Sequence, residues 1–316
     1  MSGFCKCGDG GQNLGVLACP RLLQSVKKHV RVATFDESGV RNSIKLTDLV
    51  DGKLTDAYVL GKLSSTGGDK WYLTPKTYEN VEPSRTDSSF EDFSSGAKVK
   101  IDTGVKEFMG IIPMIDAQIA AKMNAGSCST FGVYEVDSAG SIKGELSADG
   151  LELFPITVAQ GSFEAVEIEA VEGSAVQRVS ISFQYAKTVN EGQLRIINTE
   201  DILVNLLSIN GILDGELVLE GAATATSFSA TLAIADFGYF GESIPIEGQV
   251  EPADWLIVDS SLTVITPTAV SEIIAGQYDF DIPSTPAESL SVTFIGAPEK
   301  AADQMYASNT LVVVTP

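Results

Sequence analysis

Four cysteines are the side chains of this sequence best suited to metal or redox chemistry. Cys5, Cys7 and Cys19 stand close together near the start, whereas Cys128 is distant. Four thiolates can bind zinc, but a Cys-x-Cys pair with two remote partners lacks the paired spacing of a zinc knuckle. No basic segment followed by a continuous apolar core precedes them, so no secretory leader is expected and the thiols should stay reduced. Plain thiols are the favoured interpretation, with a disulfide or reactive arm and a zinc site as alternatives.

The single histidine, His29, limits acid–base and metal chemistry. One histidine cannot build a His-rich zinc site, and it offers a serine or cysteine nucleophile only one possible base. The glycines of 8–11 lack both the Lys-Ser/Thr pair of a phosphate loop and a preceding strand. We therefore expect a surface or interface histidine in a protein that is not an enzyme and that holds no cofactor and no metal.

Two pairs of carboxylates are spaced two residues apart, which places both members of a pair on one face of a strand. The pairs are Glu167 with Glu169 and Asp279 with Asp281. Calcium sites and glycosidases both use neighbouring carboxylates. Because the chain holds 42 Asp and Glu residues, such pairs arise by chance. We expect neither role for them.

The two tryptophans could form a platform for stacking sugar rings. Trp71 is followed by Tyr72, and Trp255 lies far along the chain. Large aromatic side chains also supply much of the buried area of a protein core. A core or edge position is the favoured interpretation, and the sugar platform is the alternative.

The elements that must position these groups are organised around residues 97–137. Apolar and charged residues alternate over 97–102, the period-2 pattern of a half-buried strand. Pro113 then suits the first turn of a helix over 113–125, because the first N–H groups of a helix have no partner within it. A strand pattern resumes over 128–137. The apolar stripe of the predicted helix consists of Ile115, Ile119 and Met123.

Most of the remaining chain shows short strands separated by turn signals. The clearest alternation runs from Arg178 to Tyr185 and predicts a central strand with one buried face. A weaker helix is predicted over 198–211, and a polar loop is predicted over 83–96. The apolar members of the clearest strand are Val179, Ile181, Phe183 and Tyr185. The strands predicted before the central helix cover 30–35, 43–46, 57–63 and 70–74.

Charge is unevenly distributed in this chain, whose net charge is −21. From Asp201 to Pro316, sixteen acidic residues face a single base, Lys300. A nucleic-acid binder is not expected, since a phosphate-binding face needs clustered Lys and Arg. The acidic half is either an ordinary solvated surface or one that repels an anion or docks a basic arm of a neighbouring subunit. The residues near the start that we take as assembly candidates are Cys5, Cys7, Cys19, Arg21, Lys27, Lys28 and Arg31.

Length and pattern predict a mainly β protein with an arm and two domains. Residues 1–28 form an extended N-terminal arm. Residues 29–215 form a β-sandwich or barrel packed with one α-helix. Residues 216–316 form an acidic β-sandwich with the turn rhythm of an immunoglobulin-like domain, although the Cys…Trp…Cys pattern is missing. No run approaches the ~20 apolar residues that span a bilayer, so no membrane segment is expected.

The cysteine-bearing start (CKCGDGGQNLGVLAC), the centre (KVKIDTGVKEFMGIIPMIDAQIAAKMN, then STFGVYEVD) and the acidic β-rich end resemble virion proteins of tailed bacteriophages. The resemblance is greatest to major tail tube proteins and covers the layout of residues 1–215. It implies a non-enzymatic subunit, made in the host cytoplasm, that forms hexameric rings stacked as a tube within the virion. The inner strands of such rings join into one barrel, an electronegative channel that DNA passes without specific binding.

The same resemblance implies roles for particular segments. The strand Val179–Tyr185 would contribute to the barrel, and the arm and the 83–96 loop would make contacts between rings. The C-terminal domain would be an outward decoration.

Two other functions fit the same observations. One is a different virion component, such as a head decoration or baseplate subunit, which would form trimers or remain monomeric. The other is a carbohydrate-binding β-sandwich, which requires Trp71 or Trp255 to be exposed in a groove.

Overall fold

The computed structural model of the chain is mainly β, as predicted, with several sheets and two α-helices among the residues it describes. The chain divides into two compact units, residues 1–210 and residues 211–316, which we describe separately. The described residues are 24–65, 67–94, 98–102, 104–113, 117–125, 129–169, 176–234, 243–283, 289–296 and 306–316.

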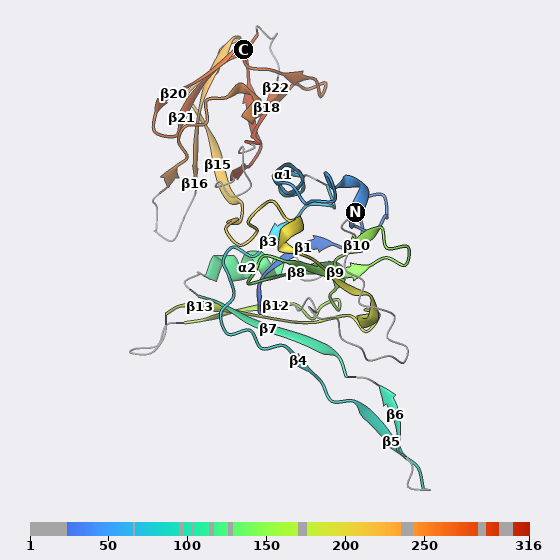
Figure 1. The fold of residues 1–316 in the computed structure, drawn as a ribbon. Coiled ribbons are helices and arrows are strands. Elements are labelled where there is room, and N and C mark those ends of the chain that lie inside the picture. Colours follow the sequence, from blue (N-terminus) through green and yellow to red (C-terminus); the bar gives the residue numbers. More distant parts are fainter. Residues whose placement is uncertain are drawn as a thin grey trace. The chain divides into compact units, whose positions relative to one another are not determined.

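The first unit is built on a sheet with the order β2-β10-β9-β8-β1-β3, to which β11 and β14 add by pairing with β8 and β9. We call it the first sheet (Figure 1). Its pairings are antiparallel, and β1 lies between β8 and β3. Its strands are β1 (Val26–Ala33), β2 (Ile44–Lys45), β3 (Tyr72–Leu73), β8 (Phe131–Asp137), β9 (Ile142–Leu146), β10 (Glu152–Phe154), β11 (Ile156–Thr157) and β14 (Leu194–Ile197).

The second sheet has the antiparallel order β12-β13-β7-β4 and lies on one face of the first sheet. The strand β13 lies between β12 and β7, and its side chains alternate between buried and partly exposed positions. The prediction of a central strand with one buried face is confirmed. The strands of this sheet are β4 (Ser84–Arg85), β7 (Lys106–Pro113), β12 (Glu164–Ile168) and β13 (Arg178–Gln184).

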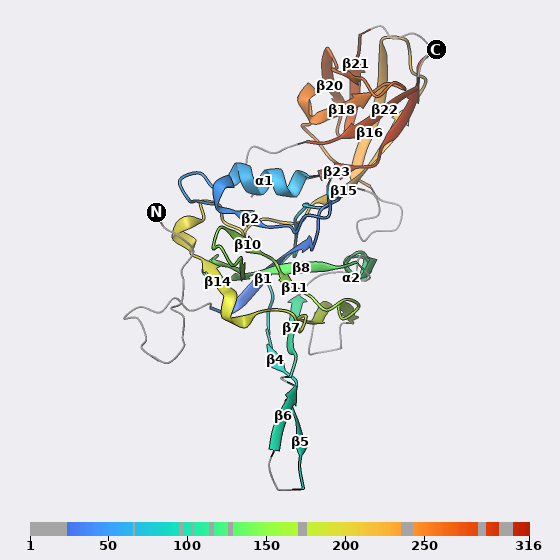
Figure 2. The same ribbon diagram turned by 90° about the vertical axis from the view of Figure 1, so that its right-hand side faces the viewer.

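The strand β8 is buried at every residue because layers cover both faces of the first sheet. The second sheet covers one face, and α1 (Asp56–Ser64) lies on the other (Figure 2). The side chains of Val59 and Leu63, four residues apart on α1, are buried there. Three short 3₁₀ turns complete this unit: Leu46–Asp48, Glu191–Gln193 and Thr199–Asp201.

The helix α1 occupies residues 57–63, for which a strand was predicted, so that prediction is wrong. Thr55 begins it as an N-cap, since its hydroxyl accepts a hydrogen bond of 3.3 Å from the Tyr58 N–H. A short apolar run reads equally well as strand or helix. The Thr55 cap and the burial of Val59 and Leu63, four residues apart, favour the helix.

The central helix is present but begins later than predicted. Pro113 is the last residue of β7, paired with Arg178, and α2 covers Ala117–Ala125. Gly126, Cys128 and residues 114–116 lie outside the described part of the chain. The weaker helix predicted over 198–211 is wrong, because only the 3₁₀ turn Thr199–Asp201 forms there and Ile202 bridges to Leu54.

Part of the segment predicted as a polar loop forms strands instead. The strands β5 (Ser89–Asp92) and β6 (Lys98–Asp102) pair with each other as a separate two-stranded sheet. They extend β4 and β7 into an arm that leaves the two layered sheets in both ribbon views (Figures 1 and 2). The strand predicted over 97–102 is confirmed by β6, but its predicted half-burial is wrong, since Val99 and Ile101 are exposed.

The first strand begins earlier than predicted. The strand β1 begins at Val26, so Lys27 and Lys28 belong to the first sheet rather than to an arm. Residues 1–23, with Cys5, Cys7, Cys19 and Arg21, lie outside the described residues.

The second unit contains two sheets whose apolar side chains share one cluster. One sheet has the order β20-β21-β16-β15-β23, with β17 paired to β16, and the other has the order β19-β18-β22-β24. The predicted boundary at 215/216 falls inside β15. A 3₁₀ turn covers Pro252–Asp254. The strands are β15 (Leu213–Glu220), β16 (Ser227–Ile234), β17 (Ile244–Pro245), β18 (Trp255–Val258), β19 (Val264–Ile265), β20 (Ala269–Ile274), β21 (Gln277–Asp281), β22 (Ser289–Phe294), β23 (Tyr306–Ser308) and β24 (Leu311–Val314).

Candidate functional site

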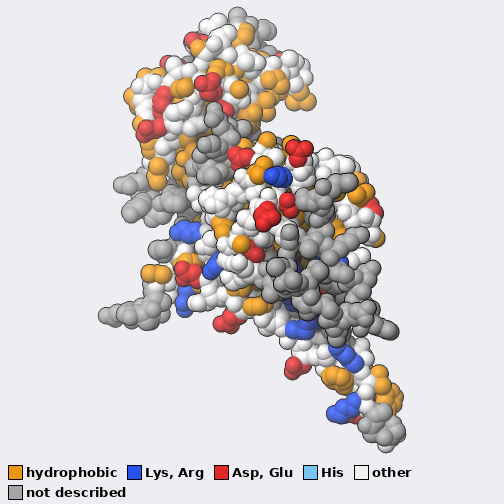
Figure 3. Space-filling view, viewed as in Figure 1, with side chains coloured by type: hydrophobic (Ala, Val, Ile, Leu, Met, Phe, Trp, Pro, Cys, Tyr) orange, Lys and Arg blue, Asp and Glu red, His pale blue; other side chains and the backbone are white. Residues whose placement is uncertain are grey.

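The projecting hairpin, β5 with β6, exposes large apolar side chains. Residues directly opposite in an antiparallel pair share a face, and side chains alternate along each strand. Glu91 is opposite Val99 and shares its face, Ile101 lies two residues further along β6 at a register shift, and Phe93 follows the last residue of β5. The exposed fractions of Phe93, Val99 and Ile101 are 47%, 50% and 63%. The space-filling view shows apolar and basic side chains along this arm (Figure 3).

The opposite face of the projecting hairpin is charged. Phe90 lies there with Asp92, Lys98 and Lys100. The Lys98 ammonium lies 3.4 Å from the Asp92 carboxylate, in a well-exposed ion pair. A pair of this kind contributes little to stability. An isolated two-stranded hairpin is at best marginally stable in water, so the apolar face is the surface from which this arm can gain most by packing on another molecule.

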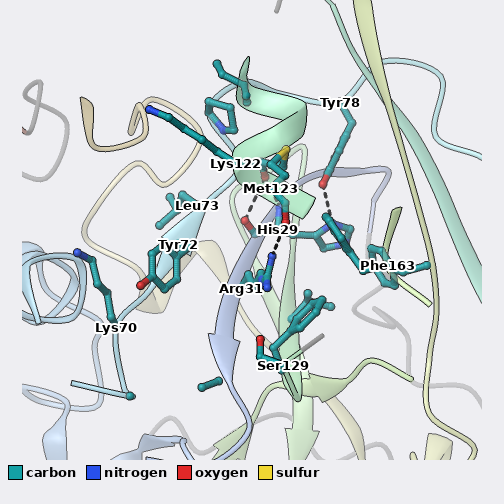
Figure 4. Close-up of a pocket in the computed structure, with 18 of the residues that line it drawn as sticks. His29, Arg31, Lys70, Tyr72, Leu73, Tyr78, Lys122, Met123, Ser129 and Phe163 are labelled. Carbon is teal, nitrogen blue, oxygen red and sulfur yellow. Dashed lines mark hydrogen bonds between the residues drawn. The ribbon is translucent and has the colours of Figure 1, made fainter. Parts of the chain in front are cut away.

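A cavity of about 520 Å³ opens between β1, β3, β8 and α2 (Figure 4). We call it the cationic cavity. Its apolar lining comes from the first sheet, from β13 and from the chain just before β12. The aromatic and aliphatic residues that contribute most are Met123, Phe131, Val133, Phe163 and Phe183.

The charged residues that line the cationic cavity are all basic. They are Arg31, Lys70 and Lys122, and none of the described lining residues carries a carboxylate. The Arg31 guanidinium lies 3.9 Å from the centroid of the Phe131 ring, and it donates a hydrogen bond of 3.1 Å to the Met123 carbonyl (Figure 4). Burial lowers the pKa of Arg31, but arginine starts so far above neutral pH that it stays charged.

His29 lies at the inner wall of the cationic cavity and is buried, so the prediction of a surface or interface histidine is wrong. Its Nδ1 lies 3.0 Å from the Tyr78 hydroxyl, and its ring meets Phe108 and Phe183 edge to face. Burial lowers the pKa of His29 to about 4, so the ring is neutral at pH 7. Its Nε2 is buried and has no hydrogen-bond partner among the described residues.

A buried ionic cluster joins the two sheets of the first unit. Glu135 on β8 accepts hydrogen bonds from the Lys143 ammonium, at 2.7 Å, and from the Tyr185 hydroxyl, which follows β13. Burial by itself would raise the pKa of Glu135, but the charges of Lys143 and Lys106 outweigh it and hold that pKa below its ordinary value. Burial raises the pKa of Tyr185 well above 10. The buried Glu135 carboxylate is paired within the chain, so we assign this cluster a structural role.

The basic residues predicted for assembly are separated by the fold. Arg31 lines the cationic cavity. Lys28 is buried on the other face of β1, where its ammonium donates to the Ile209 carbonyl at 2.6 Å, and burial lowers its pKa to about 8. Lys27 donates to the Tyr78 carbonyl at 3.3 Å. Lys28 is therefore buried within its own chain, and its role in assembly stays a prediction.

The predicted barrel residues of β13 face inward. Val179, Ile181, Phe183 and Tyr185 are all buried in a cluster shared by both sheets. Their side chains cannot line a surface between subunits, so the positions available for that role on this strand are those of the other face. The residues of that face are Arg178, Ser180, Ser182 and Gln184.

The tryptophans are both buried, with exposed fractions of 3%. Trp71 packs between Tyr58 and Tyr134, and Trp255 packs in the core of the second unit, where its indole N–H donates to the Gln249 carbonyl. The core interpretation is confirmed. An exposed platform for sugars, built on either residue, is not present.

The described residues offer no cluster of three or more His, Cys, Asp or Glu side chains that could hold a metal ion. All four cysteines lie outside them, so the zinc and disulfide alternatives stay predictions. Sequence reasoning missed the cationic cavity, because Lys70, Lys122 and Phe163 come from separate segments. The alternation over 98–102 was the available signal for the hairpin.

Searches against protein-family models and against curated proteins return no match for this chain. Within the described residues, no helix has the length and apolar character needed to cross a membrane.

Proposed function

We propose that this chain is a non-enzymatic structural subunit that assembles with copies of itself into stacked rings, as the tail tube of a tailed bacteriophage does. The tube encloses an electronegative channel for DNA, and the protein works within the virion. The observation that carries the proposal is the projecting hairpin, which presents an apolar face with nothing of its own chain to cover it among the described residues.

The energetics of the hairpin favour assembly. Phe93, Val99 and Ile101 are exposed on a hairpin that does not pair with either large sheet of the first unit. Covering such side chains contributes about 25 cal/mol per Å² of apolar area removed from water. Contact with a second copy supplies that area for every subunit of a ring or tube at once. A monomer would leave this face exposed.

The second sheet suits the wall of a channel. Its outward face carries the polar residues of β13 beside charged and apolar residues of its two neighbours. They are Arg178, Ser180, Ser182 and Gln184 on β13, Glu107 and Met109 on β7, and Glu164 and Val166 on β12. Because Arg178 is the single base among these residues, the face offers DNA phosphates no cluster of bases to bind. Together with the net charge of −21, it makes a surface along which an anionic polymer slides.

The second unit fits an acidic outward domain. Its two sheets share one apolar cluster centred on Trp255, Tyr278, Phe280 and Phe294, which is the arrangement expected of an immunoglobulin-like β-sandwich. Its excess of Asp and Glu supports solubility of a large assembly. A head decoration or baseplate subunit is the second candidate, because it shares the virion setting and the exposed hairpin. A carbohydrate-binding module is less supported, since the tryptophans it would use are buried.

Electron microscopy of the purified full-length chain over a concentration series tests the proposal. Rings or stacked tubes with an open channel wide enough for a DNA duplex are expected as concentration rises. Closed trimers without stacking would favour the decoration or baseplate alternative. A protein that remains monomeric at the highest concentration would refute self-assembly.

A further inference from the structure

We propose that the cationic cavity of one copy receives the apolar face of the projecting hairpin of a second copy, with Phe93 entering the cavity and Glu91 meeting the lysines at its rim. This inference rests on the proposed self-assembly and names the surface that receives the hairpin.

The hairpin cannot fill the cavity of its own chain. It leaves β7 at the Lys106 end, whereas α2, which contributes Lys122 and Met123 to the cavity, follows the Pro113 end. A strand of eight residues such as β7 separates its ends by roughly 26 Å. Both ribbon views show the hairpin pointing away from α2 (Figures 1 and 2). A hairpin that enters this cavity therefore has to come from another copy.

The two surfaces match in apolar chemistry. The cavity of about 520 Å³ is lined by Phe131, Phe163 and Met123, which is more room than one phenyl ring needs. Aromatic pairs gain from edge-to-face and offset contacts beyond the area that they bury. Phe93 supplies a ring that is about half exposed on its own hairpin.

The two surfaces also match in charge. Glu91 lies two residues before Phe93, so their Cα atoms stand no more than about 7 Å apart along the chain. It forms no ion pair within the described residues. Lys70 at the cavity rim likewise forms none there, and its ammonium lies 5.6 Å from the centroid of the Tyr72 ring. In a chain with twice as many acids as bases, a cavity whose charged lining is entirely basic selects an acidic guest.

The contact joins two different surfaces and is therefore heterologous. A heterologous contact repeats from copy to copy, and it produces an open stack unless the rotation between copies closes a ring. This is the geometry that a tube requires along its axis.

Charge reversal in the full-length chain tests the pairing. We expect Lys70→Glu and Glu91→Lys each to raise the concentration at half-assembly about tenfold, measured by sedimentation velocity, and the double variant to return within about threefold of the native value. Phe93→Ala should raise it further than either. Circular dichroism checks that each variant is folded.

Two variants serve as matched controls. Lys45→Glu reverses an exposed lysine on β2, at the opposite edge of the first sheet from β3. Phe90→Ala removes a ring of similar exposure from the opposite face of the same hairpin. Both should assemble within about twofold of the native protein.

Placing p-benzoylphenylalanine at position 93 gives a second readout. Irradiation of the assembled protein should link that position to peptides containing residues 67–78 or 119–123 of another copy. Native assembly with unchanged variants, or with cross-links elsewhere, would overturn the pairing while leaving the proposed function standing. A native chain that never assembles would remove both.

Discussion

Removing the charge of Glu135 should show how strongly the buried ionic cluster stabilises the first unit. Glu135→Gln keeps the shape of the side chain and an oxygen that accepts the Tyr185 hydroxyl, so it isolates the charge. The Lys143 side chain is 14% exposed and that of Glu135 is 4% exposed. Breaking a buried pair costs about 3–5 kcal/mol, and the partial access of Lys143 to water favours the lower end, about 3 kcal/mol.

The assay is urea unfolding followed by tryptophan fluorescence. Each unit holds one tryptophan, so a Trp255→Phe background reports the first unit through Trp71 alone. Lys143→Met completes a double-mutant cycle, and the coupling energy between Glu135 and Lys143 should reach at least about 1.5 kcal/mol. A decrease in the free energy of unfolding below about 0.5 kcal/mol for Glu135→Gln, or a coupling energy near zero, would refute the structural role assigned to this cluster.

The same cluster predicts an acid dependence. The folded-state pKa of Glu135 lies below its ordinary value of 4.5. Its contribution to stability is therefore complete above pH 4.5 and is lost as the pH falls through the lower, folded-state pKa. Between pH 4.5 and that pKa, the Glu135→Gln variant should lose less stability than the native chain, which unfolding curves in the same background can measure.

Three further predictions concern single side chains. The proton NMR signal of the one histidine should show a neutral ring from pH 8 down to about pH 5, because burial lowers the pKa of His29 to about 4. Since the unfolded chain binds that proton near pH 6.5, the free energy of unfolding should fall as the pH is lowered from about 6.5 to 4. A titration midpoint near 6.5 in the folded protein would contradict the burial. Ile181→Ala should cost about 2–5 kcal/mol in urea unfolding, because its side chain is fully buried between the sheets, and a cost under 1 kcal/mol would show that the core is looser than described. Asn124→Ala should speed hydrogen exchange at the Ala165 amide and lower the free energy of unfolding by about 1–3 kcal/mol. The reason is that the Asn124 side chain accepts from the Ala165 N–H at 2.9 Å and donates to the Ala165 carbonyl at 2.7 Å. Unchanged exchange at this amide would mean that Asn124 does not protect the strand edge.

The hydrogen bonds of Asn124 bear on how the second sheet could join a neighbour. Its side chain satisfies the outward backbone groups of Ala165 on the edge strand β12, as edge strands commonly need. A continuous barrel across subunits would have to pair with β12 beyond this position or displace the amide. The hairpin contact needs no such exchange.

Local patterns in the sequence determined the elements that depend on neighbouring residues alone. The alternation around Ile181 predicted β13 and its buried face, because a period of two is set by the strand itself. Composition and pattern likewise predicted the mainly β fold and the core position of Trp255. The helix α1 was missed although Thr55 stood in place as its cap, because a short apolar run satisfies both periods.

Tertiary structure decided everything that depends on which segments become neighbours. Lys28, His29 and Glu135 are buried because layers cover both faces of the first sheet, and no local signal distinguishes such a charged residue from an exposed one. The cationic cavity exists because β1, β3, β8 and α2 meet around it. The sequence by itself determined the chemistry of each side chain and the period of each element. Which side chains face water, a partner or one another depends on burial and pairing between distant segments, so only the fold determined it.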